Sequence, residues 1–476
     1  MCECVFLPVV TTMLRHGVLA ASSVRRLMSS STPRFRELLR TPTLAHTLNN
    51  LQIFTPNAIQ AEALPLAQQG DDILVCAQTG SGKTLCFLLP MIDRMASRSA
   101  AVRQSSLHAR DYDVMEDDDD GEHGSPNKKR KPKMVTRPEA LILVPSFELG
   151  RQICAVADML TQDLPDAPEV LLLSNGNRFG PEKRALQTGA PRLIVATPAR
   201  LLYHLDEGNL VLSKVRQIAI DEVDAVMCAT DGNRRQEIEL LLHKLRTGGA
   251  RRKKAPPSKR QYILAAATVS EEHAAQISEQ LGALPRRVSH RGILVPTLRQ
   301  QFHFVRGDKE QELLRLLERC YETEWLRDGA TLVFCRGPRR AQRVFDLLSE
   351  AGLPAHEAAL LHGDNMPGER TLALSKLNDL EVRVLVCTDV AARGLDLPLV
   401  NHVIMYDMPR DFTTYIHRAG RTARAGKPGL VTAMVKENEL EMYKEIRRGE
   451  APGTPLQKYG GRDARETETK THDSCP

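Results

Sequence analysis

Short apolar runs separated by amphipathic stretches are the dominant pattern of this chain. In its first part these runs are Ile73–Cys76, Ala140–Pro145, Val170–Ser174, Leu193–Ala196, Ile218–Ile220 and Tyr262–Ala266. Each run is continuous rather than alternating, which is typical of strands buried on both faces of a parallel sheet. The amphipathic stretches between them predict helices that cover the two faces. Residues 35–68 also predict helices, with a break at Pro56.

A second series of the same kind begins near residue 297. Its apolar runs are Leu332–Cys335, Val384–Cys387 and Val403–Met405. The join at residues 284–296 contains Pro285 and Pro296, which is typical of a short linker. The pattern therefore predicts an α/β protein with two tandem domains, residues 35–285 and 297–449, each a parallel sheet with helices on both faces.

Three stretches lack this periodicity. Residues 97–137 contain the acidic block Glu116–Asp120 and the basic run Lys128–Lys133, and they predict a disordered insertion because such charge blocks bury too little apolar surface. The basic run suits a nuclear-import signal or an RNA-binding tether, and a solvated loop without either role is an equal alternative. Residues 247–259 predict a polar loop, and residues 450–476 a disordered tail.

The first 34 residues have the composition of a targeting leader. From Met13 onward they contain Arg25, Arg26 and several serines, and no acidic residue occurs before Glu37. This composition is typical of an organellar transit peptide. We therefore predict a mitochondrial matrix protein, cleaved between Arg26 and Phe35. An unstructured tail is the alternative for the leader, and entry into the nucleus or nucleolus through residues 128–133 is the alternative for location.

Composition narrows the class of protein. Apolar residues make up 42% of the 476, which is enough for buried cores. The net charge of +6 understates the basic character, because residues 111–122 hold eight acidic residues and no basic one. A basic fold suits polyanions, although a basic solvated surface is the plainer reading. Aromatic residues make up only 4%, so base stacking is not expected to be the main binding device.

No apolar run approaches 18 residues, so we expect no membrane span. None of the ten cysteines forms a C-x-x-C pair, and we expect reduced, buried thiols.

A phosphate-binding loop is the strongest local signal. Residues 77–84 follow the apolar run Ile73–Cys76 and precede a helix-like stretch. Gly80 and Gly82 allow the backbone N–H groups to turn inward around phosphates. Lys83 supplies a positive charge for the β/γ oxygens, and the Thr84 hydroxyl is placed to bind Mg²⁺. The usual pattern opens with Gly, where this chain has Ala77.

Acidic residues follow a second buried run. Asp221 and Glu222 come directly after Ile218–Ile220, and Asp224 follows them. Asp221 is suited to hold Mg²⁺ through its waters, and Glu222 is suited to deprotonate an attacking water. Acidic residues after a strand are often only helix caps. The phosphate loop about 140 residues upstream favours the catalytic interpretation.

These motifs, in this order, resemble the DEAD-box RNA helicases of superfamily 2 over about residues 35–445. Phe35 with Pro56–Gln60 resembles the adenine-reading Q motif of that family. The other matching segments are Pro145–Leu149, Thr197–Arg200, Asp221–Asp224 (a DEVD form of the DEAD motif), Ala266–Thr268, His362–Asp364 with Arg370, Thr388–Asp396 and Tyr415–Arg424. The resemblance implies two RecA-like domains that close on ATP and Mg²⁺, and single-stranded RNA held through its backbone without a base code.

The resemblance also implies a set of site residues. The catalytic residues implied are Lys83, Asp221, Glu222, His417 and the arginine fingers Arg421 and Arg424. The implied nucleotide contacts are Gln60, Ala77, Gln78, Thr79, Gly80, Ser81, Gly82, Lys83, Thr84, Gly394 and Asp396. The implied RNA contacts are Pro145, Thr197, Arg200, Gly363, Arg370 and Thr388. Asp224 and Thr268 would couple the domains, and Thr84 and Asp221 would hold Mg²⁺. Because Arg421 and Arg424 lie three residues apart, we expect them to face one direction at the start of a helix.

The chain also departs from the family pattern. It has Gln52-Ile53 where the family has Gly followed by an aromatic residue, with Phe54 one place later. Phe147 replaces an arginine, and Ala266 replaces a serine whose hydroxyl could bond Asp224. Ala199 and Val223 are further replacements. Ala266 and Phe147 keep one other reading open, an RNA clamp that binds ATP and serves as an assembly scaffold with weak unwinding. A DNA helicase is a second alternative. We expect a monomer that acts with ribonucleoprotein partners.

Overall fold

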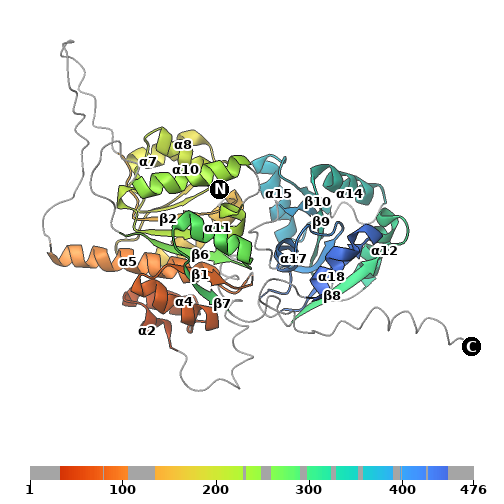
Figure 1. Cartoon of the computed structure of the whole chain (residues 1–476), viewed down its shortest axis with the longest axis horizontal. Coiled ribbons are helices and arrows are strands. Elements are labelled where there is room, and N and C mark those ends of the chain that lie inside the picture. The colour runs from red at the N-terminus through yellow and green to blue at the C-terminus, as the bar shows by residue number, and fades with distance from the viewer. Residues whose placement is uncertain are drawn as a thin grey trace, which may run out of the picture.

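The computed structural model describes residues 33–78, 80–105, 135–228, 232–247, 259–289, 297–322, 328–351, 358–389, 397, 399–424 and 427–448. Within these residues the chain forms two parallel sheets, each with helices on both faces, and the two domains lie side by side (Figure 1). The predicted α/β architecture is confirmed. No helix in this part of the chain is long and apolar enough to cross a membrane. The leader, the charged runs of the insertion and the C-terminal tail fall outside the described residues.

The first domain is built on a seven-stranded sheet with the order β3-β4-β2-β5-β6-β1-β7. Its strands are β1 (Ile73–Cys76), β2 (Ala140–Leu143), β3 (Val170–Leu173), β4 (Leu193–Ala196), β5 (Gln217–Ile220), β6 (Gln261–Ala266) and β7 (Arg286–Ser289). Its helices are α2 (Phe35–Leu38), α3 (Pro42–Asn50), α4 (Ala58–Gln69), α5 (Lys83–Ser105), α6 (Phe147–Thr161), α7 (Phe179–Thr188), α8 (Pro198–Asp206), α9 (Val223–Met227), α10 (Gly232–Thr247) and α11 (Glu271–Leu281), with a 3₁₀ turn at Leu212–Lys214.

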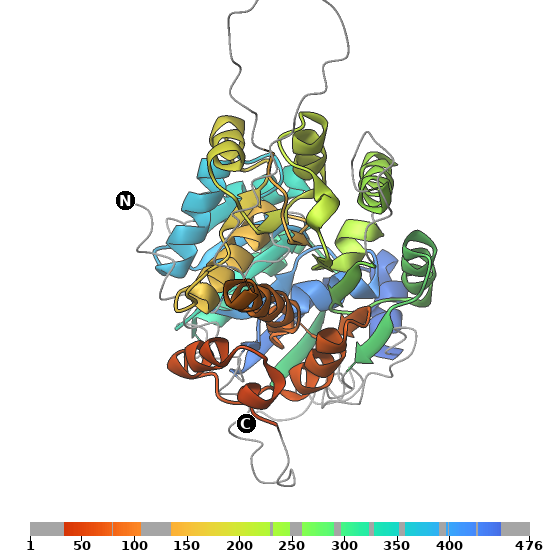
Figure 2. The same ribbon diagram turned by 90° about the vertical axis from the view of Figure 1, so that its left-hand side faces the viewer.

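The two faces of this sheet bury separate apolar cores. Helices α2 to α6 pack on one face, where Ile73, Val75 and Ile142 point. Helices α7 to α11 pack on the other, where Leu74 and Cys76 point. The first helices of the group α2 to α6 are drawn in red, near the bottom of Figure 2. The inner strands β4, β2, β5, β6 and β1 are thus covered on both sides, as the continuous apolar runs predicted, whereas β3, at the edge of the sheet, is only half-buried.

Two predicted boundaries were wrong. Residues 286–289, predicted as part of a linker, form the edge strand β7, which pairs in parallel with β1. The pattern concealed this strand because an edge strand needs little apolar surface: only Val288 among its four residues is buried. Helix α5 continues to Ser105, so residues 97–105 of the predicted insertion are helical. The first part of this stretch is held against the domain, because Arg192 Nη1 donates to Ser99 Oγ at 2.9 Å.

The second domain is built on a six-stranded parallel sheet with the order β10-β11-β9-β12-β13-β8. Its strands are β8 (Leu298–Phe304), β9 (Ala330–Cys335), β10 (Ala358–Leu361), β11 (Val384–Thr388), β12 (Val400–Met405) and β13 (Gly429–Val435). Its helices are α12 (Lys309–Glu322), α14 (Pro338–Glu350), α15 (Pro367–Asn378), α17 (Phe412–Ala419) and α18 (Leu440–Arg448), with a 3₁₀ turn at Glu437–Glu439. Helices α15, α17 and α18 cover one face, and α12 and α14 the other.

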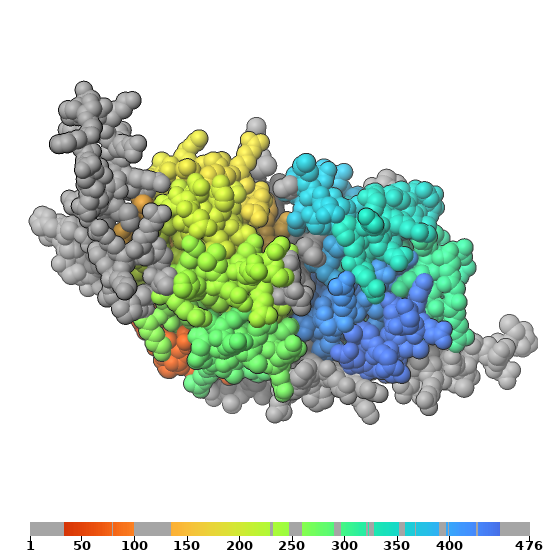
Figure 3. Space-filling view, turned by 45° about the horizontal axis from the view of Figure 1, so that its top comes forward, coloured from red at the N-terminus to blue at the C-terminus, as the bar shows by residue number. Residues whose placement is uncertain are grey.

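The two domains contact each other through side chains, among them Arg370 with Glu148 and Thr268 with Thr413. The space-filling view shows the first domain, in green and yellow, against the second, in cyan and blue (Figure 3). Cys76, Cys86, Cys335 and Cys387 are buried free thiols, as predicted.

Candidate active site at the domain interface

The phosphate loop lies between β1 and α5, and both of its glycines adopt left-handed backbone conformations. The φ angles are 79° at Gly80 and 75° at Gly82, values that side chains disfavour. A Cβ atom at Gly82 would lie 2.5 Å from Gln60 Nε2. Lys83 Nζ donates to the carbonyl oxygens of Ala77 at 2.6 Å and Gln78 at 2.9 Å. The loop is therefore folded as predicted, with its lysine held over it. Thr79, also predicted to contact the nucleotide, lies outside the described residues.

Gln60 is fixed against this loop by the start of α4. Asn57 caps the helix, and its side-chain oxygen accepts from Gln60 N at 3.0 Å while Gln60 Oε1 accepts from Asn57 N at 3.0 Å. Gln60 Nε2 donates to Gly82 O at 3.1 Å, and Asn57 Nδ2 donates to Ser81 O at 2.7 Å. The structure thus brings the predicted Gln60 to the phosphate loop. It also brings Asn57 there, which lies in the matched segment Pro56–Gln60 but was not predicted as a site residue.

The residues before α4 explain one departure from the family pattern. Gln52, which stands where the family has glycine, adopts a φ of 61°. The chain therefore has a left-handed backbone conformation at this position without a glycine, the residue that adopts it most easily. Ile53 is fully buried in the core and cannot face a nucleotide, whereas the Phe54 ring is half exposed.

The acidic residues lie at the same edge of the sheet as the phosphate loop. Strand β5 is separated from β1 only by β6, and all three are parallel, so their carboxyl ends meet. Asp221 Oδ1 accepts from Glu222 N at 2.9 Å, and Glu222 has a φ of 47°. Burial, reinforced by the neighbouring Glu222 charge, raises the pKa of Asp221 to about 6, against the opposing effect of Lys83. Burial also lowers the pKa of Lys83, although Asp221 and Glu222 oppose that shift.

The second domain completes this site. Arg421 Nη2 lies 3.9 Å from Glu222 Oε1, and His417 Nε2 lies 3.7 Å from Asp224 Oδ2. The Cβ position of Gly80 lies 3.7 Å from Arg424 Cγ, so the stem of Arg424 passes over the phosphate loop. Both arginines therefore face the first domain.

The expected helix start at these arginines was wrong. Helix α17 ends at Ala419 and is followed by Gly420, so Arg421 and Arg424 lie in the turns after the helix. These turns fix the two side chains by local hydrogen bonds: Arg421 Nε donates to His417 O at 3.0 Å, and Arg424 Nε donates to Gly420 O at 2.9 Å.

Several buried polar atoms at this interface have no hydrogen-bond partner. They are Gln78 Oε1, Ser81 Oγ, Glu222 Oε2, Asp224 Oδ1 and His417 Nε2. Buried polar groups are rarely left unsatisfied, so such a cluster indicates a place for a polar ligand. Loop N–H groups, a lysine and arginines on one side and carboxylates on the other fit a polyphosphate that carries a divalent cation. Among the described residues, no three His, Cys, Asp or Glu side chains are grouped as a metal cage.

The two coupling residues predicted from sequence both contact the second domain. Asp224 faces His417, and Thr268 Oγ1 donates to Thr413 Oγ1 at 3.4 Å. Thr84 lies at the start of α5, as expected for a metal-binding hydroxyl after the loop. Gly394 and Asp396 lie outside the described residues.

The predicted RNA contacts follow the carboxyl ends of strands or the starts of helices in both domains. Pro145 follows β2, Thr197 follows β4, Gly363 follows β10, and Thr388 ends β11 as a buried residue. Arg370, on α15, forms an ion pair with Glu148 of the first domain at 2.9 Å. Arg200, on α8, donates through Nε to Glu182 at 2.6 Å and through Nη2 to Asn177 O at 3.0 Å. Part of each guanidinium is thus already engaged within the protein.

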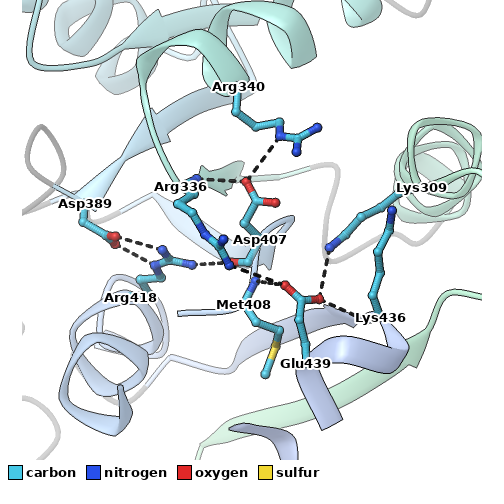
Figure 4. A network of polar contacts seen from close by, with 9 residues as sticks. All are labelled: Lys309, Arg336, Arg340, Asp389, Asp407, Met408, Arg418, Lys436 and Glu439. Atoms are coloured by element: carbon cyan, nitrogen blue, oxygen red, sulfur yellow. Dashed lines mark hydrogen bonds and ion pairs between the residues drawn. The ribbon is translucent and has the colours of Figure 1, made fainter. Parts of the chain in front are cut away.

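Sequence reasoning missed a buried arginine network in the second domain (Figure 4). Arg418 donates to both carboxylate oxygens of Asp389, at 2.6 and 2.8 Å, and to Asp407 O at 2.6 Å. Its guanidinium carbon also lies 5.2 Å from the centroid of the Phe334 ring. Because Arg418 follows His417 and precedes Arg421, this network fixes the segment that faces the first domain. Asp389 and Arg418 both lie inside the matched motifs, but nothing local indicates that they pair.

Comparisons with known proteins agree with this geometry. The family model for the DEAD/DEAH box helicase matches residues 57–277, and the model for the helicase conserved C-terminal domain matches residues 308–426. The "DEAD-box ATP-dependent RNA helicase 39" of Arabidopsis thaliana is 29% identical over 96% of this chain and 67% of its own length. The "ATP-dependent RNA helicase SrmB" of Haemophilus influenzae is 30% identical over 87% of this chain and 82% of its own length.

A solved structure has the same fold. The S. cerevisiae protein Dbp5, bound to RNA and ADP BeF3, matches with a TM-score of 0.66 and 22% identity, over 87% of this chain and 92% of that one. Other curated relatives are longer proteins, and the chain spans only 57% and 47% of the length of two of them.

Proposed function

Because this chain belongs to the DEAD-box family of ATP-dependent RNA helicases, we propose that it hydrolyses ATP in response to bound RNA. We propose further that the closing and reopening of its two domains separates short RNA duplexes or remodels RNA–protein particles. The observation that carries this proposal is the approach of Arg421 to Glu222 and of His417 to Asp224 across the domain interface, at 3.9 and 3.7 Å.

The division of the site between two domains supplies the dependence on RNA. The phosphate loop and the acidic residues belong to the first domain, whereas Arg421 and Arg424 belong to the second. Turnover needs both domains together. The predicted RNA contacts Thr197 and Arg370 also come from different domains, so a bound strand holds the domains in the closed arrangement. Without RNA, the arginines spend less time near the phosphates and turnover is slow.

Each residue at the interface has a defined task in this proposal. The N–H groups around Gly80 and Gly82, with Lys83, hold the phosphates of ATP. Asp221 and Thr84 would hold Mg²⁺, which would supply positive charge to the phosphate oxygens. Glu222 accepts the proton of the attacking water. Arg421 and Arg424 stabilise the charge that develops on the transferred phosphoryl group, an effect worth roughly 10³–10⁵ in rate in related enzymes.

Phosphate release measured with and without single-stranded RNA tests this function. We expect RNA to raise the rate at saturating ATP and Mg²⁺, and the Lys83→Ala variant to lose nucleotide binding. Single-stranded DNA of the same sequence is the control, and we expect it to stimulate less because the family reads the RNA backbone. Equal rates with and without RNA would refute the proposal, and equal stimulation by DNA would favour a DNA helicase.

One observation supports the alternative of an ATP-dependent RNA clamp with weak unwinding. Ala266 lies in β6, beside the phosphate loop, and is fully buried; Ala77 N donates to its carbonyl oxygen at 3.1 Å. Asp224 Oδ1 is buried without a partner. A serine hydroxyl at position 266 is the group that the family would offer there. We expect Ala266→Ser to raise strand separation per ATP hydrolysed. An unchanged ratio would show that another group relays the signal.

We also propose that the chain acts as a monomer in the mitochondrial matrix. Both halves of the catalytic constellation come from one chain, which supports the monomer, and light scattering of the purified protein tests it. The acid-free leader supports import into mitochondria. Imaging of a C-terminally tagged protein and sequencing of its mature N-terminus test this location. Nuclear signal with an intact leader would favour the alternative that uses residues 128–133.

A further inference from the structure

Helices α7 and α8 lie side by side at the top of the first domain (Figure 1) and carry an exposed aromatic ring. The Tyr203 side chain, on α8, is 49% exposed. Its ring meets the Phe179 ring, at the start of α7, with 4.8 Å between centroids and an interplanar angle of 85°. Phe179 in turn stacks on the ring of the buried His204, with 4.8 Å between the centroids and an interplanar angle of 22°. Tyr203 is therefore the outermost ring of an ordered aromatic group.

A buried carboxylate holds this aromatic group in place. Glu182 of α7 accepts from Arg200 Nε at 2.6 Å and from Ser174 N at 2.9 Å, and it lies 3.0 Å from His204 Nε2. Burial alone would raise the pKa of Glu182, but the hydrogen bonds of His204, Ser174 N and Arg200 lower it below its usual range. Glu182 thus stays charged and ties α7 to α8.

Positive charge surrounds the rings. Arg200 Cζ lies 5.3 Å and Lys183 Nζ lies 5.8 Å from the centroid of Phe179. Arg178 and Arg184, at the start and in the middle of α7, are exposed. Aromatic faces interleaved with cations suit a nucleic-acid strand, because the base stacks on a ring while the phosphates meet the cations.

Tyr203 lies close to two of the predicted RNA contacts. Helix α8 begins directly after Thr197, and Arg200 lies on it three residues before Tyr203. Three residues span about 4.5 Å along a helix and bring side chains to the same face. A strand whose phosphate lies at Thr197 and Arg200 therefore has a neighbouring base within reach of Tyr203.

We propose that Tyr203 is a stacking platform for one unpaired base of the bound RNA, next to the phosphate held at the start of α8. This inference rests on the proposed RNA-dependent function and adds one base-contacting position to a surface otherwise expected to bind only the backbone. Stacking on a ring is tolerant of base identity, so the site adds affinity without a sequence code.

RNA affinity in the presence of a non-hydrolysable ATP analogue tests the proposal. We expect Tyr203→Ala to weaken binding roughly 5- to 150-fold, the fold-change that corresponds to one stacked base. Tyr203→Trp retains a ring and should bind at least as well as the unmodified protein. The slope of affinity against salt should stay unchanged in both variants, because no phosphate contact is lost.

The matched control is Phe304→Ala. Phe304 is 39% exposed and contacts Tyr443 edge-on, with 5.1 Å between centroids and an angle of 82°, but it lies on the edge strand β8 of the second domain. We expect this variant to bind RNA as the unmodified protein does. A Tyr203→Ala effect no larger than that of Phe304→Ala overturns the proposal.

An RNA series in which each nucleotide in turn lacks its base locates the contact in the unmodified protein. We expect one position where the abasic nucleotide weakens binding, and we expect Tyr203→Ala to abolish the difference at that position alone. If every abasic effect persists in the variant, Tyr203 does not stack on a base while RNA binding itself stands. If the unmodified protein does not bind RNA at all, the proposed function and this inference fall together.

Discussion

Replacement of Arg418 by lysine should weaken the second domain and slow turnover. Arg418 is buried, and its three hydrogen bonds to Asp389 and Asp407 O are 2.6 to 2.8 Å long. A lysine ammonium keeps the charge but cannot make the two-pronged contact with the Asp389 carboxylate. We therefore expect a loss of about 1.5–3 kcal/mol, the contribution of one hydrogen bond to a charged group. Arg418→Ala should cost about 3–5 kcal/mol, because it leaves Asp389 without its cation.

The same network supplies a control. Arg336 lies on the rim of this network (Figure 4), where its side chain is 58% exposed and 4.0 Å from Glu439. Exposed ion pairs contribute about 0–1 kcal/mol, so Arg336→Ala should leave stability nearly unchanged. Amide hydrogen exchange of β11 and β12 measures the stability of the second domain separately from the first. In a double-mutant cycle with Asp389→Asn, Arg418→Lys should show a coupling of about 1 kcal/mol or more.

The consequence for activity follows from the position of Arg418 between His417 and Arg421. A loosened α17 leaves Arg421 less often near Glu222, so kcat for phosphate release with saturating RNA should fall. ATP affinity measured without RNA should change little, because the phosphate loop belongs to the first domain. The reasoning is refuted if Arg418→Lys and Arg336→Ala lose the same stability, or if the cycle shows no coupling.

Three further predictions concern single residues. Glu222→Gln should abolish turnover but keep ATP and RNA binding, because an amide cannot accept a proton; RNA released as fast as from the unmodified protein in the presence of ATP would contradict this role. His402 is buried in β12 and its pKa is lowered by burial to about 3. Its neutral form stabilises the fold above pH 6.5, and this contribution is lost as the pH falls toward 3. Urea unfolding should therefore show a loss of about 2 kcal/mol between pH 6.5 and pH 5 that His402→Gln removes, and an equal slope in the variant would exclude this residue. Gln52→Gly should stabilise the first domain by roughly 1 kcal/mol, since the φ of 61° at position 52 suits glycine; thermal unfolding compared with Gln52→Ala, which should give no gain, tests it.

The sequence determined the features that depend on neighbouring residues. Continuous apolar runs such as Ile73–Cys76 identified the central strands, because a strand buried on both faces has few polar residues. The spacing of Gly80, Gly82 and Lys83 determined the phosphate loop, since a turn between a strand and a helix needs those residue types locally. The acidic residues Asp221 and Glu222 were identified because they directly follow a buried apolar run. The order of the motifs along the chain identified the family.

The pattern of apolar and polar residues predicted edge strands and helix boundaries less well. Strand β7 has one buried residue among four, so it gave no apolar run, and the structure shows it only through its pairing with β1. The helix start expected at Arg421 and Arg424 was wrong, because their spacing of three residues is compatible with a helix or with turns, and here they follow the end of α17.

The pairing of charged groups could not be predicted before the chain was folded. Arg370 pairs with Glu148, Arg418 with Asp389 and Arg200 with Glu182, and the first of these pairs joins residues more than 200 positions apart in different domains. Each of these arginines has many possible partners in the sequence. Which one it contacts depends on how the strands are ordered within a sheet and, for Arg370, on how the two domains pack against each other. The raised pKa of Asp221 has the same origin, because it reflects burial and a neighbouring charge that exist only once the strands are packed.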